Sequence, residues 1–73
     1  MDNTIEYKGY IGSVGFSEPD GVFFGKVQGI RSLISYEGTN VSELVEDFHS
    51  AVDDYLDYCA KNGETPEIAF NGR

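Results

Sequence analysis

The stretch NVSELVEDFHSAVDDYLDYCAKNG, residues 40–63, decides the fold because it predicts one long amphipathic helix. Apolar side chains recur in it every three or four residues, a spacing that places them on one side of a helix with 3.6 residues per turn. These apolar residues are Val41, Leu44, Val45, Phe48, Ala51, Val52, Tyr55, Leu56 and Cys59. An isolated helix of this length is marginal in water, so the stripe must be buried against the rest of the chain.

Both ends of this helix carry residues that helix termini favour. Asn40 offers a side-chain oxygen to a free backbone N–H, and Glu43 follows three positions later, as in a capping box with Asn in place of Ser or Thr. Near the other end, Lys61 supplies a cation to the last turn and Gly63 can adopt the left-handed conformation that ends many helices. We therefore expect the helix to begin at Asn40 and to end at Gly63.

The residues before the helix predict an antiparallel sheet. Residues 5–17 are rich in β-branched and aromatic residues and predict one long strand, whose buried side switches near Gly9 to Gly12 through a bulge or a twist. Glu18-Pro19-Asp20-Gly21 has the composition of a tight turn, so a hairpin is expected there. Residues 22–27 and 33–37 predict two further strands.

Short connections between these segments favour a meander with the helix packed across one face. The expected fold class is α+β, in the order β-β-β-α: a three-stranded antiparallel sheet with one long helix on a face. Ile68-Ala69-Phe70 is a possible short C-terminal strand. Seventy-three residues make one domain, and an exposed strand edge in such a small sheet favours a homodimer or a higher oligomer.

Composition excludes several functions. Thirteen acidic against five basic residues give a net charge of −8, and residues 32–60 contain no Lys or Arg, so direct nucleic-acid binding by this segment is not expected. No run is long enough and apolar enough to span a membrane. The single Cys59 continues the apolar stripe, which favours a packed thiol, and the N-terminus lacks the regions of a signal peptide. A cytoplasmic protein is expected.

The sequence offers little that resembles an active site. Residues 21–27 resemble a phosphate-binding loop, but the spacing is one residue short and Val27 stands where Ser or Thr would hold the metal ion. His49 has no second His, Cys or Ser near it in the pattern of a metal site or a nucleophile pair. A two-metal carboxylate cluster would require oxygens to converge, whereas the acids are expected on a hairpin tip, at a strand end and on the outer helix face. We expect no enzyme activity, no cofactor and no bound metal.

The outer face of the predicted helix is acidic, with Glu43, Glu46 and Asp47 near its start and further acids toward its end. Asp53, Asp54 and Asp57 have poor helix propensity and lie toward the negative end of the helix dipole, so local stability does not explain them. Asp57 and Lys61 can form an ion pair across one turn. Two interpretations stay open, a solvated face or a surface for a basic partner.

Several motifs together resemble the N-terminal domain of the HicB antitoxin family. They are Tyr7-Lys8-Gly9-Tyr10-Ile11-Gly12-Ser13-Val14, then Asp20-Gly21-Val22-Phe23-Phe24-Gly25-Lys26-Val27, then Glu37-Gly38, and Ala51-Val52-Asp53-Asp54-Tyr55-Leu56 in the helix. The resemblance covers nearly the whole chain. It implies a partial RNase H-like fold without a working catalytic carboxylate set.

The resemblance also implies a function in a type II toxin-antitoxin system. Such a domain binds and neutralises HicA, a small basic mRNA-cleaving toxin, and covers its active surface. Family members usually carry a C-terminal DNA-binding domain, and these 73 residues are expected not to include one. The alternative is a regulatory or oligomerisation module of a transcriptional repressor without a cognate toxin.

The family pattern assigns no particular residue of this chain to partner binding, so the candidate residues come from charge. We expect the toxin to contact three acids on the outer side of the predicted helix, with three further acids at the rim of the interface. The helix residues are Asp53, Asp54 and Asp57, and the rim residues are Glu18, Asp20 and Glu37.

Overall fold

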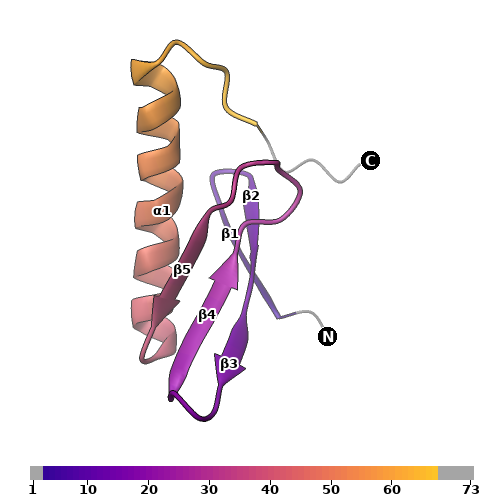
Figure 1. Ribbon diagram of the computed structural model, residues 1–73, viewed down its shortest axis with the longest axis vertical. Helices are drawn as coiled ribbons and strands as arrows, with labels where there is room; N and C mark the ends of the chain where they lie inside the picture. The colour runs from indigo at the N-terminus through magenta and orange to yellow at the C-terminus, as the bar shows by residue number, and fades with distance from the viewer. Residues whose placement is uncertain (1–2, 68–73) are drawn as a thin grey trace.

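The computed structural model describes residues 3–67, which form five strands and one helix (Figure 1). The elements are β1 (Thr4–Tyr7), β2 (Tyr10–Ser13), β3 (Gly15–Ser17), β4 (Val22–Lys26), β5 (Ser35–Gly38) and α1 (Val41–Lys61). The sheets are antiparallel and the long helix packs against them, so the predicted α+β class is confirmed. The possible strand at residues 68–70 lies outside the described residues.

Helix α1 begins and ends where the sequence predicts, because both ends are capped. The Asn40 side chain accepts a hydrogen bond of 2.8 Å from the backbone N–H of Glu43. The Glu43 carboxylate in turn accepts from the backbone and the hydroxyl of Thr39, one residue earlier than a capping box requires, and these bonds hold the pKa of Glu43 below its ordinary value. Gly63 has φ +67°, and Glu64 N–H donates to the Cys59 carbonyl in a Schellman arrangement.

The expectation of one long strand over residues 5–17 is wrong, because the chain reverses at Lys8 and Gly9. Both residues have positive φ, +52° and +85°, as in a type I′ hairpin turn. The turn pairs β1 with β2 in antiparallel register, with Tyr7 opposite Tyr10. Because the turn has two residues, the inward-facing side chains have odd residue numbers in β1 and even residue numbers in β2. Tyr7 and Tyr10 therefore both lie on the core side.

Strands β2 and β3 act as one strand toward β4. Gly12 pairs with Val27 and Gly15 with Phe24, and these pairings belong to one uninterrupted register. Between them the Ser13 hydroxyl bonds to the backbone N–H and carbonyl of Lys26. Strand β5 then pairs with the other edge of β4, so the three-stranded sheet has the order β3-β4-β5, as predicted.

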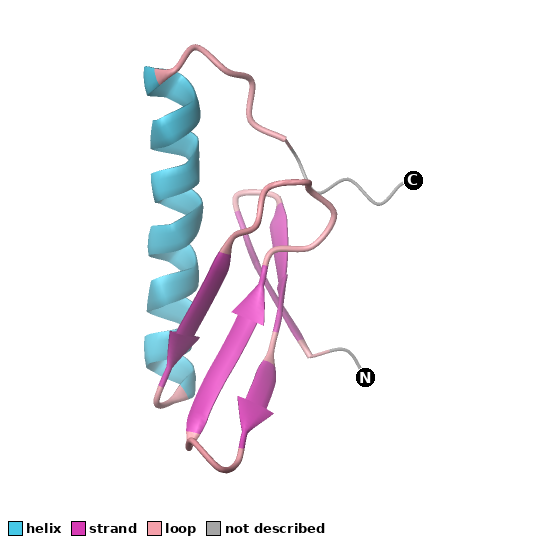
Figure 2. Cartoon of the chain, viewed as in Figure 1, coloured by secondary structure: helices cyan, strands magenta, loops and turns pink. Residues whose placement is uncertain are grey.

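The core lies between α1 and the sheet surface that faces it (Figure 2). From the helix it receives Leu44, Phe48 and Val52, which are fully buried, while the first residue of the predicted stripe, Val41, stays 57% exposed. Three buried side chains from the sheet and the following loop complete this cluster. They are Tyr10, Val27 and Tyr36.

After α1 the chain returns toward the sheet, as Figure 2 shows for the loop that follows the helix. The backbone N–H of Glu67 donates to the Tyr55 hydroxyl at 2.9 Å. The Glu67 carboxylate accepts from the backbone N–H of Arg31 at 2.9 Å. This returning segment therefore links Tyr55 of α1 to the loop between β4 and β5.

The hydroxyl of Tyr36 occupies a narrow space over β2. It donates to the backbone carbonyl of Ser13 at 2.8 Å, which links β5 to the point where β2 passes into β3. This approach is possible because residue 12 is glycine: a Cβ atom there would overlap the Tyr36 hydroxyl and lie 3.0 Å from the Phe48 ring. Tyr36 is only 4% exposed, and this burial raises its pKa to about 12.

Replacing Gly12 with alanine should lower the free energy of unfolding by about 1–3 kcal/mol, because the new methyl group overpacks the core against the Tyr36 hydroxyl. The overlap should be partly relieved by Tyr36→Phe, which alone costs about 1 kcal/mol for its lost hydrogen bond. Chemical denaturation of the two single variants and the double variant checks this. Strict additivity of the two changes would show that Gly12 and Tyr36 do not meet.

The protein should lose stability as the pH rises from about 10 to about 12, partly through Tyr36. Its phenol holds its proton more tightly in the folded chain than in the unfolded chain. The contribution is therefore complete below the unfolded pKa and disappears as the pH passes the folded pKa. Denaturation midpoints measured across this range should fall less steeply for Tyr36→Phe than for the natural chain. Equal slopes would contradict a buried, un-ionised Tyr36.

Candidate acidic binding site

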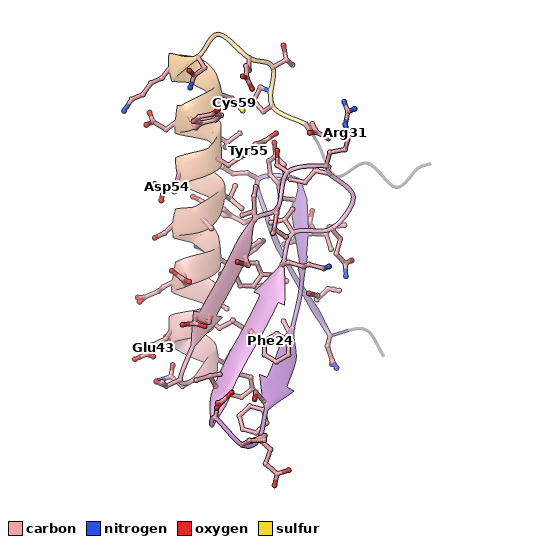
Figure 3. The ribbon with its side chains drawn as sticks, in the orientation of Figure 1. Phe24, Arg31, Glu43, Asp54, Tyr55 and Cys59 are labelled. Atoms are coloured by element: carbon pink, nitrogen blue, oxygen red, sulfur yellow. The ribbon has the colours of Figure 1, made fainter. Side chains whose placement is uncertain are left out.

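The exposed side of α1 carries a row of acidic side chains. We call Glu43, Glu46, Asp47, Asp54 and Asp57 the acidic helix face; all five are exposed. Figure 3 shows Glu43 and Asp54 pointing away from the sheet. The buried stripe occupies the opposite side of the same helix, so packing of the core fixes the direction in which these carboxylates project.

An acidic groove of about 430 Å³ lies where α1 runs beside β5. Two of its carboxylates are held in place by backbone groups: Asp47 accepts the Glu37 N–H at 2.9 Å, and Glu43 accepts the Thr39 N–H at 3.0 Å. These bonds orient the carboxylates without neutralising them. The groove is lined by Glu37, Glu43, Glu46, Asp47 and Ser50.

Glu37 was predicted as a rim residue at the end of a strand, and the structure brings it into this acidic groove. Glu43, Glu46 and Asp47 were placed on the outer helix face but left out of the candidate site. Their spacing of three and four residues is the signal that could have grouped them, since it aligns them on one side of a helix. Their closeness to Glu37 depends on the packing of α1 against β5.

Asp53 is set apart from the acidic helix face by the β1–β2 hairpin. Lys8 donates to its carboxylate at 2.8 Å and the Tyr7 hydroxyl lies 3.2 Å away. The bond from Lys8 holds the pKa of Asp53 below its ordinary value, and the same bond raises the pKa of Lys8. The Tyr7 ring also stacks on His49 at 3.9 Å between centroids. Asp53 therefore offers a partner less uncompensated charge than its neighbours do.

Asp54 and Asp57 continue the acidic helix face toward the helix end. Asp57 pairs with Lys61 at 3.1 Å, as the spacing predicts, but both side chains are exposed and such pairs are weak. Asp54 lines a shallow groove beside the exposed side chains of Leu33 and Tyr58. Both carboxylates remain accessible to a partner.

Glu18 and Asp20 lie on the turn between β3 and β4, and the structure does not bring them into the acidic groove. Asp20 accepts a hydrogen bond from the Ser17 hydroxyl at 3.2 Å, a local contact that supports the turn. The structure thus joins one of the three predicted rim residues, Glu37, to the helix.

The chemistry of this site is that of exposed, separated carboxylates. Within residues 3–67, no three His, Cys, Asp or Glu side chains are arranged to hold a metal ion. Cys59, a residue that is only 1% exposed, lies in the buried stripe of α1. The same part of the chain contains no helix that is long and apolar enough to cross a membrane.

Comparison with known proteins adds no relative. No model of a protein family, no curated protein and no solved structure matches this chain. The resemblance to the HicB family therefore rests on the sequence motifs quoted above. The geometry of the acidic helix face stands independently of it.

Proposed function

We propose that this chain is an antitoxin-like domain that binds a small basic HicA-type mRNA-cleaving toxin and neutralises it by covering its active surface. The observation that carries the proposal is the acidic helix face, a row of exposed carboxylates on a rigid element. The HicB-like motifs supply the kind of partner. In this proposal the domain works by binding, without catalysis and without a cofactor, in the cytoplasm, and its fold is the partial RNase H-like one.

The charge pattern suits a basic protein. Residues 32–60 include seven acids and no Lys or Arg, so no cation in this part of the chain opposes the approach of another positive surface. The carboxylates near the helix end work against the helix dipole, a local cost that a bound cationic surface would offset. Charge of one sign on an open surface chiefly raises the rate of association with an oppositely charged partner.

The same charge explains how binding would inhibit a ribonuclease. An enzyme that cleaves mRNA must hold phosphates with clustered Lys and Arg. A row of carboxylates can occupy those cations in place of the RNA. Because the acidic helix face repels nucleic acid, the domain would compete with the substrate for the toxin surface and not bind the RNA itself.

The alternative, a regulatory or oligomerisation module, is favoured by a different observation. The face of the three-stranded sheet that α1 does not cover carries an exposed Phe24. A module of this kind would self-associate without a toxin. Co-purification of the chain with a small basic protein encoded by a neighbouring reading frame would separate the two functions.

Neutralising three acids of the helix face should weaken toxin binding. The triple variant Glu46→Gln, Asp54→Asn and Asp57→Asn avoids Glu43 and Asp47, whose carboxylates hold backbone N–H groups. We expect the association rate with the neighbouring basic toxin, in a catalytically inactive form, to fall about tenfold at low salt, with a smaller dependence on ionic strength. Stopped-flow or surface-binding kinetics at several salt concentrations measure this.

The matched control changes the net charge equally at exposed positions outside the predicted interface. It combines Glu6→Gln, Gln28→Lys and Glu64→Gln, three exposed positions on β1, in the loop after β4 and in the loop after α1. This control should retain most of the association rate. If both triple variants bind equally, or if the helix variant keeps full affinity at low salt, the acidic helix face is not the toxin interface.

A further inference from the structure

The sheet has an open face on the side away from α1. Side chains of a strand point alternately to its two faces, so every second residue of β4 and β5 faces away from α1. Figure 3 shows Phe24 on β4, pointing away from α1. A shallow groove of about 760 Å³ crosses this surface. We call the following residues, all among those lining it, the outer sheet face: Ser13, Phe24, Lys26, Leu33, Ser35 and Glu37.

The outer sheet face has an apolar centre. Phe24 is 46% exposed and Leu33, in the loop before β5, is 83% exposed. The Phe24 ring lies over Gly15 on the neighbouring strand, where a Cβ atom would come within 2.8 Å of it. A glycine in this position lets the ring lie close against the backbone. A half-exposed aromatic ring is a favourable anchor for another protein surface.

Two opposite charges flank this centre. Lys26 lies opposite Ser35 and Glu37 opposite Phe24, so the cation and the acid occupy diagonal positions on adjacent strands. Lys26 forms no ion pair within residues 3–67, whereas Lys8, Arg31 and Lys61 each lie within 4.0 Å of a carboxylate. The outer sheet face therefore presents one positive and one negative charge on either side of an apolar ring.

This pattern selects the kind of partner. A second copy of this chain would be repelled by the acidic helix face, since both copies carry the same sign there. On the outer sheet face, the positive charge of Lys26 would repel a basic partner. A second copy that approaches the outer sheet face by a two-fold rotation meets neither obstacle, because the cation of each copy faces the acid of the other.

We propose that the outer sheet face is the contact surface between two copies of this chain in a two-fold symmetric dimer. The Phe24 rings meet near the axis and pack against Leu33, while Lys26 of each copy pairs with Glu37 of the other. Such a contact leaves the exposed side of α1 uncovered in both copies. The inference is independent of the proposed toxin, because it concerns only the association of the chain with itself.

Sedimentation equilibrium at concentrations from about 1 µM to about 1 mM, a range that covers weak and moderate self-association, tests the proposal. The natural chain should form dimers, and Phe24→Ser should reduce the association constant at least tenfold. Lys26→Glu and Glu37→Lys should each weaken the dimer, because each places like charges across the axis. The double variant Lys26→Glu/Glu37→Lys should dimerise again, and so should an equimolar mixture of the two single variants, as a heterodimer.

Two controls make the same changes in net charge elsewhere. Lys61→Glu and Glu64→Lys lie in exposed positions at and beyond the end of α1, and both should leave the dimer unchanged. The proposal is overturned if the natural chain stays monomeric at the highest concentration. It is equally overturned if the mixture of Lys26→Glu and Glu37→Lys fails to associate, or if the controls weaken the dimer as much as the charge changes on the outer sheet face do.

Discussion

The packing of Phe48 between the helix and the sheet is the constraint on which the rest of the structure depends. Its ring is fully buried and lies 4.9 Å from the Tyr36 ring of β5 and 6.4 Å from the Tyr7 ring of β1, measured between centroids. The ring also lies close to Gly12 on β2, where a Cβ atom would come within 3.0 Å of it. One helix side chain thus meets three strands, and it fixes both the height and the rotation of α1 relative to the sheet.

That rotation determines where the charges lie. Once Leu44, Phe48 and Val52 are buried, the opposite side of α1 must project away from the sheet, and that side carries the five carboxylates of the acidic helix face. The same rotation brings Asp47 to the edge of β5, where it accepts the Glu37 N–H. A free N–H on an edge strand invites pairing with another chain, so this carboxylate also protects the edge. The neutral outer sheet face is then a better place for self-association than the strand edge.

The sequence predicted the helix well because its signals are local. Each of these signals can be recognised within a few residues: the three- and four-residue spacing, Asn40 at the start and Gly63 at the end. The hairpin at Lys8 and Gly9 was missed because Lys is rare at positive φ and gives no turn signal. The change in side-chain alternation near Gly9 to Gly12 predicts a bulge or a twist, but a two-residue turn produces the same change.

The candidate site was predictable only in part, for a related reason. The acids of the helix could be assigned to one face from spacing, yet Asp53 was grouped with Asp54 and Asp57 because nothing local shows that Lys8 reaches it across the hairpin. Glu37 joins Glu43 and Asp47 through tertiary packing, which a single sequence does not encode as a pattern. Spacing therefore predicts which face of a helix or strand a residue occupies, whereas its neighbours on other elements are known only once the fold is known.

The two proposed surfaces meet at β5, so binding at one of them would affect binding at the other. Glu37 lines both the acidic groove and the outer sheet face, and its backbone N–H is held by Asp47 of α1. A chain with a net charge of −8 repels a second copy over a distance set by the ionic strength. A basic protein bound to the acidic helix face would reduce that repulsion and so favour the dimer. By thermodynamic linkage, the dimer would then favour the bound partner by the same factor.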